Sequence, residues 1–261
     1  MRIDCHVHGD PDDLKGDPRA YVEACRERGI EAVGLIEGLD KCLKAMEKFG
    51  DFVIPIVRVR MDSAGAKEIA DAVKAGAKAI KFIRPRAPYA DERYWPLYAK
   101  LEELGATAVF HTGYLAFNER EDRPVWMEHM RAAQIEVVSR RFPDLKILMS
   151  HFSNPWWEEA WKVSWSKKNV YADLSGGTAI HRSTTMWAEM FAPDGQLLES
   201  SIKKLCFGSD VGYFHDGKFP FEDYITFHER IFNRIGLSPD LREVVNRGNA
   251  RMLFGLAGGA A

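Results

Sequence analysis

The sequence predicts a (β/α)₈ barrel of the TIM type, and two observations lead to it. Eight short runs rich in β-branched and aromatic residues alternate with longer segments of helical period. Strands that alternate with helices pair in parallel through right-handed crossovers, and eight such units close a barrel. An open doubly wound sheet is the alternative. It is disfavoured because the first strand continues into His8-Gly9-Asp10-Pro11, without the glycine pattern of a phosphate-binding turn.

The elements are expected in a regular order. The strands are predicted at residues 2–8, 31–37, 52–60, 77–84, 107–113, 146–152, 170–176 and 204–210. The helices are predicted at residues 18–28, 40–48, 64–75, 92–104, 124–141, 155–167, within 182–201, at 221–235 and at 239–254. Proline stands near the first turn of several helices, where its missing N–H costs nothing, and Gly29, Gly76 and Gly105 stand where a helix must stop.

Length and composition favour one domain. With 261 residues and 46% hydrophobic content, the chain can bury the core of a barrel. We expect one barrel domain over residues 1–255 and a small-residue tail over 256–261. Lys and Arg number 36 against 38 Asp and Glu, which argues against nucleic acid as a partner and favours a small-molecule substrate.

Location follows from what the sequence lacks. No apolar run approaches the roughly 18 residues that a membrane span needs, and no leader-like segment precedes the first strand. The four cysteines are scattered without a C-x-x-C pair, as is typical of reduced thiols. We therefore expect a cytoplasmic protein without a membrane partner. The cysteines are Cys5, Cys25, Cys42 and Cys206.

Titratable side chains gather at the ends of the predicted strands. His6 and His8 end the first strand, and alternation places both on one side, with Asp4 beneath them. Later strands end in His111, His151 and Asp210. The carboxyl ends of barrel strands meet at one face, where active sites lie. A shared divalent metal ion would offset the desolvation cost of several such groups.

The residue types point to a catalytic metal site. Three imidazoles and one carboxylate, with a position open for water, form a catalytic zinc site and leave one histidine for acid–base work. We expect one Zn²⁺, with Mn²⁺, Co²⁺ or Fe²⁺ as alternatives. Such an ion lowers the pKa of bound water to about 7 or polarises a carbonyl. A binding protein or a structural metal is disfavoured, because structural zinc prefers closed, cysteine-rich sites.

These motifs resemble a known family. The histidines on strands 1, 5 and 6 with the aspartate on strand 8 resemble the amidohydrolase superfamily. The segments Ile80-Lys81-Phe82, His111-Thr112-Gly113, Ser150-His151-Phe152 and Phe207-Gly208-Ser209-Asp210 resemble its amidohydrolase-related branch, which includes aminocarboxymuconate semialdehyde decarboxylase. The likeness spans residues 4 to 254. The chain departs from the branch after His151, where the branch tends to have glycine, and after Asp210, where it has a proline-bearing turn.

The resemblance assigns roles to residues. It implies that the metal is held by His6, His8, His111 and Asp210, and that His151 stays unligated as the general acid and base. Members of the branch are hydrolases, decarboxylases and hydratases of small carboxylated or cyclic compounds. The family analogy also allows a second subunit to cover the substrate, so a homo-oligomer is compatible with the prediction.

Lys81 has three interpretations, and other residues are expected around the substrate. Lys81 could be carboxylated and bridge two metal ions, hold a substrate carboxylate, or extend its amine from the barrel rim. Arg58 and Arg84 add positive charge near the ends of strands 3 and 4, which favours an anionic substrate unless they are solvated loop residues. Trp156 and Tyr114 are expected to line the opening.

The favoured function is hydrolysis. The metal would activate a water, His151 and Asp210 would manage its protons, and hydroxide would attack an ester, lactone or amide of a small, anionic molecule. The alternative is a non-oxidative decarboxylase, or a hydratase, acting on a small carboxylated aromatic or muconate-type acid. Both reactions need a metal ion, a proton carrier and a group that binds the anion, so the sequence leaves them open.

Overall fold

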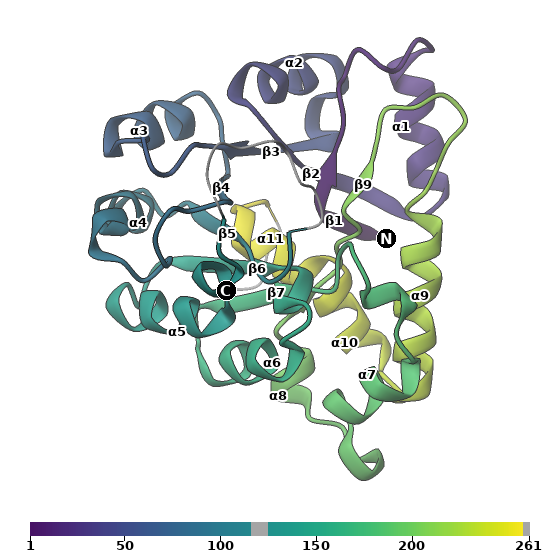
Figure 1. Cartoon of the computed structure of the whole chain (residues 1–261). Coiled ribbons are helices and arrows are strands. Elements are labelled where there is room, and N and C mark those ends of the chain that lie inside the picture. The colour runs from purple at the N-terminus through teal and green to yellow at the C-terminus, as the bar shows by residue number, and fades with distance from the viewer. Residues whose placement is uncertain (116–124, 258–261) are drawn as a thin grey trace.

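Parallel strands form one curled sheet at the centre of the molecule, as Figure 1 shows. The computed structural model describes residues 1–115 and 125–257. In space the strands follow the order β8-β7-β6-β5-β4-β3-β2-β1-β9. They are β1 Arg2–His8, β2 Ile30–Glu37, β3 Val53–Arg58, β4 Ala79–Phe82, β5 Thr107–His111, β6 Lys146–Ser150, β7 Val170–Asp173, β8 Leu205–Cys206 and β9 Val211–Gly212.

A single segment of chain closes the sheet into a barrel. The strand β8 pairs with β7, and β9, only a few residues later, pairs with β1. The residues between β8 and β9 also bond to β1. The amide of Cys5 donates to the carbonyl of Phe207 at 2.9 Å, and the amide of Asp210 donates to the carbonyl of His6 at 2.7 Å. The predicted (β/α)₈ fold is therefore confirmed. The predicted eighth strand, 204–210, contains only the short strand β8, and β9 follows just beyond its predicted end.

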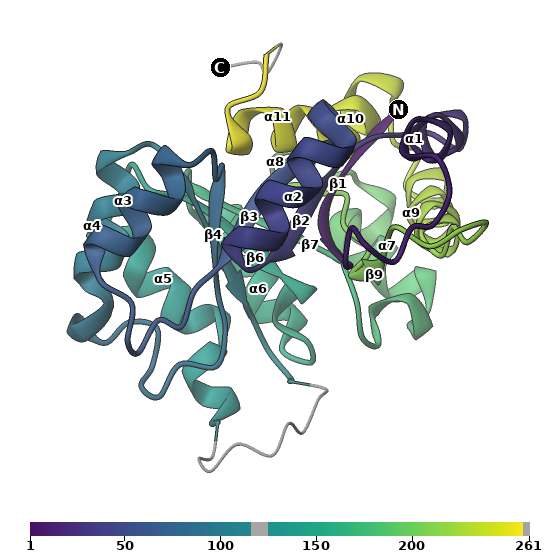
Figure 2. The same ribbon diagram turned by 90° about the horizontal axis from the view of Figure 1, so that it is seen from above.

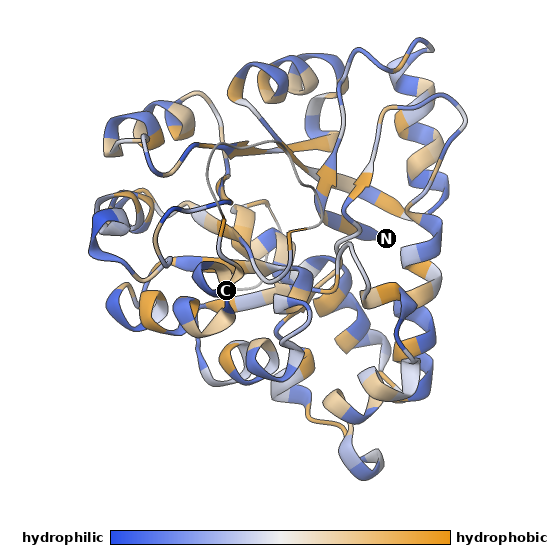
Figure 3. Cartoon of the chain, in the orientation of Figure 1, coloured by the Kyte–Doolittle hydropathy of each residue, from blue (hydrophilic) through white to orange (hydrophobic). Residues whose placement is uncertain are grey.

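Helices surround the sheet on its outer side, and the last of them covers one end of the barrel (Figures 1 and 2). They are α1 Pro18–Glu27, α2 Leu39–Phe49, α3 Ala66–Lys74, α4 Trp95–Glu103, α5 Ala132–Arg141, α6 Trp157–Ser166, α7 Thr184–Phe191, α8 Glu199–Ile202, α9 Glu222–Arg234, α10 Pro239–Glu243 and α11 Asn249–Phe254. The hydropathy colouring of Figure 3 shows mixed orange and blue along these helices, as expected when one helix face packs on the sheet.

Several predicted helices are shorter or interrupted. The predicted helix at 239–254 divides into α10 and α11 around a π-helical turn at Val244–Gly248, and the stretch within 182–201 holds both α7 and α8. Residue 124, where another helix was expected to begin, and residues 258–261 of the expected tail lie outside the described residues. No helix in the described part of the chain is long and apolar enough to cross a membrane.

The inside of the barrel is apolar at the amino ends of its strands. There α11 lies across the opening and packs on the strands, and Thr107 donates from Oγ1 to the carbonyl of Leu253 at 2.5 Å (Figure 1). This plug leaves the opposite, carboxyl end of the strands for polar groups. The buried interior cluster contains Ile3, Cys5, Ala32, Ile36, Ile54, Ile56, Ala79, Val109, Leu148, Cys206, Ala250, Leu253 and Phe254.

His228 of α9 is a buried polar residue of the outer core. Its ring lies 5.0 Å from the ring of Phe207 and 5.7 Å from that of Phe232. Neither ring nitrogen has a hydrogen-bond partner within the described residues. Burial, aided by the charge of Arg2, lowers the pKa of His228 to about 3. Between about pH 3 and pH 6.5, His228 is therefore neutral in the folded protein but protonated in the unfolded chain.

We predict that His228→Phe stabilises the protein more at pH 5 than at pH 7.5. Because the folded pKa lies below the unfolded value, wild-type stability is lost as the pH falls from 6.5 towards 3, by about 2 kcal/mol at pH 5. Phenylalanine removes this loss and the unpaired nitrogens. Urea unfolding at both pH values measures the difference, with His181→Phe, at an exposed position in a short 3-10 helix, as the control. An equal gain at both pH values would contradict the prediction.

Candidate active site

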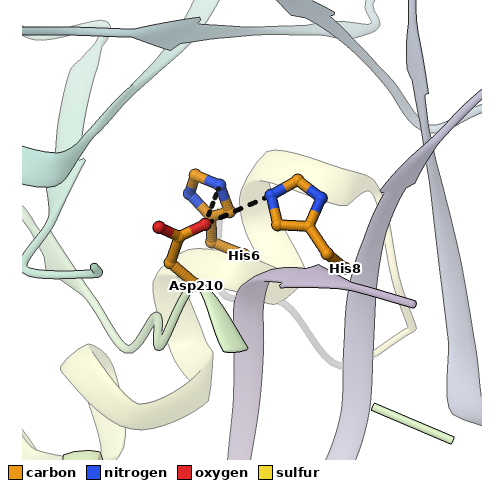
Figure 4. A group of neighbouring side chains, drawn as sticks. All are labelled: His6, His8 and Asp210. Atoms are coloured by element: carbon orange, nitrogen blue, oxygen red, sulfur yellow. Dashed lines mark ion pairs between the residues drawn. The ribbon is translucent and has the colours of Figure 1, made fainter. Parts of the chain in front are cut away.

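Three predicted metal ligands converge at the carboxyl end of the barrel. His6 and His8 come from β1, and Asp210 comes from the turn between β8 and β9. The Oδ1 atom of Asp210 lies 3.3 Å from Nε2 of His6 and 3.1 Å from Nε2 of His8 (Figure 4). Two imidazole nitrogens and a carboxylate oxygen suit a divalent metal ion. His8 and Asp210 remain partly exposed, which leaves the group open towards solvent.

An irregularity in β1 aims these histidines. The pairing of β1 with β2 advances from Asp4 to Val7 on one strand while it advances only from Val33 to Leu35 on the other. This extra residue is a β-bulge and interrupts the simple alternation of side chains. Asp4 therefore does not lie beneath the two histidines as expected. Its carboxylate accepts hydrogen bonds from the Ser209 hydroxyl at 2.6 Å and from the Tyr213 hydroxyl at 3.2 Å.

The two β1 histidines are oriented through their second ring nitrogens. Nδ1 of His8 lies 3.1 Å from the carbonyl oxygen of Ile36. Nδ1 of His6 lies 3.1 Å from Oγ of Ser175 and 3.5 Å from Oδ2 of Asp173. Such contacts free the Nε2 atoms for a metal ion and fix the ring planes. Burial lowers the pKa of His6 to about 3, so its ring is neutral and ready to bind a cation.

His151 stands beside this group in a strained turn. His151, Phe152 and Ser153 all have positive φ, so the predicted strand ends at Ser150. The amide of His151 donates to Oδ1 of Asp173 at 2.9 Å, and its Nδ1 lies 3.1 Å from the carbonyl oxygen of Ser175. Burial lowers the pKa of His151. The ring is neutral at pH 7, and its Nε2 has no hydrogen-bond partner among the described residues.

His111, the fourth predicted ligand, lies next to His151 and outside the group of His6, His8 and Asp210. Its centroid is 4.5 Å from that of His151, and it does not share with Asp210 the close set of atoms formed by His6 and His8. Nε2 of His111 lies 3.2 Å from the carbonyl oxygen of Tyr114, which leaves Nδ1 for another partner. The structure thus brings together three of the four predicted ligands and places His111 beside His151, the predicted proton carrier.

A second set of potential ligands lies deeper, formed by His6, His151 and Asp173. We interpret it as a hydrogen-bonded support. Oδ1 of Asp173 accepts from the amides of His151 and Ser175 and from the Ser175 hydroxyl. Burial opposes ionisation of Asp173, but the hydrogen bond from His6 and the neighbouring imidazoles outweigh it and hold its pKa below the usual range. These three donors all reach Oδ1, whereas the buried Oδ2 has no hydrogen-bond partner among the described residues and lies 3.5 Å from Nδ1 of His6.

Lys81 lies inside the barrel and not at the rim. Its side chain is only 2% exposed, and Nζ donates to the hydroxyl of Ser150 at 2.7 Å. The strand β4 places it there because residues of the inner face alternate from Ala79 to Lys81. Burial lowers the pKa of Lys81 to about 8, against the opposing charges of Asp173 and Asp210. An ammonium group therefore lies close to the histidines.

The other predicted substrate residues are more dispersed. Arg58 is exposed and lines a cavity of about 460 Å³ between β3 and α3 that shares no residue with the metal-binding group. Arg84 is half-buried with a φ of 57° in the loop after β4. Trp156 lies under the Arg131 guanidinium, 4.7 Å from its ring centre. Tyr114 is 55% exposed, and its carbonyl contacts His111.

Sequence analysis missed Ser175 and Gly176, which follow β7. Ser175 is fully buried between His6 and His151. Gly176 has a φ of 66°, and a Cβ there would overlap the carboxylate of Asp210, lying 3.0 Å from its Cβ. The signal was present in the spacing Asp173-x-Ser175 at the end of a barrel strand, where alternation puts both residues on one side.

Gly176→Ala is predicted to weaken metal binding by at least about tenfold, because the new methyl group displaces the Asp210 carboxylate. Gly177→Ala is the matched control. Its φ is also positive, but a Cβ there meets only the end of the Asn154 side chain, at 3.1 Å. Both variants should lose about 1–2 kcal/mol of stability from backbone strain. Zn²⁺ titration against a chromophoric chelator measures the difference, and equal affinities of the two variants would contradict it.

One family model matches most of the chain. The family model described as Amidohydrolase matches residues 39–256, which include His111, His151 and Asp210. No curated protein sequence matches the chain significantly.

Solved structures resemble the whole fold. An uncharacterised TIM-barrel protein from Bordetella bronchiseptica has a TM-score of 0.69 at 18% identity, covering 98% of this chain and 99% of that one. A probable 2-pyrone-4,6-dicarboxylic acid hydrolase from Acinetobacter baumannii, with citric acid bound, has a TM-score of 0.64 at 14% identity, with the same coverage. A 2,6-dihydroxybenzoate decarboxylase from Rhizobium has a TM-score of 0.64 at 16% identity, covering 98% and 99%. On the family match and the shared fold, this chain belongs to the amidohydrolase family of enzymes.

Proposed function

We propose that this enzyme is a metal-dependent hydrolase acting on a small, anionic ester, lactone or amide. One observation carries the proposal: Nε2 of His6, Nε2 of His8 and Oδ1 of Asp210 converge at the carboxyl end of the barrel, beside His151. The Nε2 atoms of both histidines are free to bind a cation, and the partial exposure of His8 and Asp210 leaves such a cation in contact with solvent. Sites with vacant positions of this kind are catalytic, whereas structural sites are closed.

One divalent ion, most simply Zn²⁺, fits this donor set, with Mn²⁺, Co²⁺ or Fe²⁺ as alternatives. His6, His8 and Asp210 would hold it, and His111 is proposed as a further ligand through its remaining nitrogen. When bound, such an ion lowers the pKa of a water and polarises a carbonyl oxygen. Burial opposes ionisation of Asp210, but its contact with His6 and its hydrogen bond with His8 hold its pKa well below the usual range.

The proton chemistry falls to His151 and Asp210. With Nδ1 directed to the Ser175 carbonyl, the imidazole of His151 offers Nε2 as a base towards the open side of the site. Its lowered pKa keeps that nitrogen unprotonated at neutral pH. Oδ2 of Asp210 lies 3.9 Å from Nδ1 of His151, close enough to stabilise the ring after it gains a proton. His151 would therefore take a proton from the attacking water and return it to the leaving group.

An anionic substrate is proposed because a cation lies below the histidines. Lys81 is the buried positive charge nearest the site, and Arg84, Arg58, Tyr114 and Trp156 stand on the loops or strand ends of the same face. The hydrolase and decarboxylase with similar folds are named for a pyrone dicarboxylic acid and a dihydroxybenzoate, both carboxylated compounds. These names support a small carboxylated molecule as the substrate class.

Non-oxidative decarboxylation is the second candidate function. It is favoured by the ammonium group of Lys81, which could hold a leaving carboxylate close to His111 and His151, and by the fold shared with a dihydroxybenzoate decarboxylase. In that reaction the C–C bond to the carboxylate breaks, CO₂ leaves, and a proton that His151 has first taken from water replaces it on carbon. Both reactions would use the same metal ligands.

We expect the protein purified without chelator to contain about one Zn or Mn ion per chain. His6→Ala should lose the ion because it removes a ligand, and Lys81→Ala should keep it because Lys81 bonds to Ser150 and not to the ligand atoms. Elemental analysis of the three proteins provides the measurement. About two ions, falling in Lys81→Ala, would instead indicate a pair bridged by a carboxylated lysine, and a metal-free wild type would refute the proposed function.

Turnover should fall by about 10²–10⁴ in His151→Asn while the metal content stays unchanged, because the variant loses the base but no ligand. A panel of lactones and carboxylated aromatic esters, followed by acid release, measures hydrolysis, and trapped CO₂ from aromatic or muconate-type acids measures decarboxylation. His129→Asn, a half-buried histidine outside the site, is the control. Full turnover in His151→Asn would remove this residue from the mechanism, and CO₂ release without acid release would favour the lyase.

A further inference from the structure

Ser175 lies between two functional imidazoles. Its Oγ is 3.1 Å from Nδ1 of His6 and 3.2 Å from Nδ1 of His151, and it also bonds to Oδ1 of Asp173. The side chain is fully buried, so no water competes for these contacts. A single hydroxyl group thus connects a proposed metal ligand, the proposed proton carrier and a buried carboxylate.

The direction of each hydrogen bond follows from the number of protons and lone pairs that each group has. A hydroxyl has one proton to donate and two lone pairs that accept. The ionised carboxylate of Asp173 can only accept, so it takes the proton of Ser175. Towards both imidazoles, Oγ can then only accept, and each Nδ1 must carry a proton. The carbonyl oxygen of Ser175, 3.1 Å from Nδ1 of His151, also accepts and requires the same ring form.

We propose that Ser175 is a positioning residue that fixes the Nδ1–H tautomer of both His6 and His151. This tautomer leaves Nε2 of His6 for the metal ion, at the place where it faces Asp210. It also leaves Nε2 of His151 for proton transfer. The consequence for metal binding rests on the proposed function, whereas the tautomers themselves do not.

Glycines at positions 208 and 176 allow close packing around Ser175 and around Asp210, respectively. A Cβ at Gly208 of the closing segment would lie 3.3 Å from Cβ of Ser175 and 3.0 Å from that of Asp173. A Cβ at Gly176 would overlap Asp210, as described above. The closing segment therefore packs directly on the Asp173–Ser175 pair. This packing is independent of the hydrogen bonds, and it shows that a side chain of serine size fits between the two rings.

The two histidines depend on the hydroxyl to different degrees. If the hydroxyl is removed, His151 retains the carbonyl oxygen of Ser175 at 3.1 Å as an acceptor. His6 retains only Oδ2 of Asp173, at 3.5 Å. Loss of the hydroxyl should therefore disturb His6 more than His151. A general loosening of the barrel would give no such asymmetry.

The test is nitrogen NMR of ¹⁵N-histidine-labelled, metal-free protein at pH 7, with His6 and His151 assigned from His6→Gln and His151→Gln. In the wild type, both rings should show a protonated Nδ1 and an unprotonated Nε2. In Ser175→Ala, the His6 nitrogens should shift towards a mixture of tautomers while those of His151 stay close to wild type. The dissociation constant for Zn²⁺, measured by chelator competition, should rise about 10–100-fold.

Ser209→Ala is the matched control, since it removes an equally buried hydroxyl from a carboxylate at a neighbouring strand end without touching a histidine ring. It should leave the His6 nitrogens unchanged. The proposal is wrong if wild-type His6 is protonated at Nε2, if Ser175→Ala leaves the His6 nitrogens unshifted, or if both serine variants weaken Zn²⁺ binding equally. A wild type that binds no Zn²⁺ would refute the proposed function, and the wild-type spectra would still decide the tautomers even if a variant failed to fold.

Discussion

The carboxylate of Asp173 is the group on which the other parts of the site depend. It is fully buried, and a buried charge is costly unless donors surround it. Its Oδ1 receives the amide of His151 from the turn after β6 and both the amide and the hydroxyl of Ser175 from the chain after β7. These bonds join two neighbouring strand ends. They also direct His151 and, through the Ser175 hydroxyl, His6.

The same carboxylate stabilises an unfavourable backbone. Residues His151 to Ser153 have φ values of 67°, 47° and 52°, and such conformations cost on the order of 1–3 kcal/mol each in non-glycine residues. The Thr112 hydroxyl donates to the Ser150 carbonyl at 2.6 Å and accepts from the Ser153 amide at 2.9 Å, which supports the turn from the β5 side. Side chains from the strands on both sides of β6, Asp173 of β7 and Thr112 after β5, therefore hold the strained turn and keep the His151 ring beside His6.

This arrangement explains the short motifs that the sequence displays. In His111-Thr112-Gly113, the threonine supports the neighbouring turn, and a Cβ on the glycine would lie 2.6 Å from the Asn154 nitrogen. In Phe207-Gly208-Ser209-Asp210, the glycine admits Asp173, the serine binds Asp4 and the aspartate faces the histidines. In each motif, one residue contributes a side chain to the site, and the residues next to it support that side chain by packing or hydrogen bonding across strands.

Sequence alone could predict the barrel and the convergence of His6, His8 and Asp210, because strand alternation and the meeting of strand ends are encoded locally. It could not predict the bulge that moves Asp4 away, since the bulge depends on pairing with β2. It leaves three roles open for Lys81, because the contact of Nζ with the Ser150 hydroxyl joins residues far apart in the chain. The spacing Asp173-x-Ser175 indicates that both residues lie on one side of the strand, but the contacts of Ser175 with His151 and His6 span 24 and 169 residues of chain and depend on the fold.

The balance of charge connects this framework to the choice of substrate. Around the imidazoles lie one buried cation, Lys81, and three carboxylates, those of Asp173, Asp210 and Glu37, whose Oε1 lies 4.0 Å from Nδ1 of His8. This excess of carboxylates favours a divalent cation over a monovalent one. Burial keeps His6 and His111 neutral, and the charge of Lys81 adds to the effect, so both rings stay available as ligands. Lys81 thereby contributes to metal binding although it is not itself a ligand, and the proposed preference for a carboxylated substrate depends on the same ammonium group.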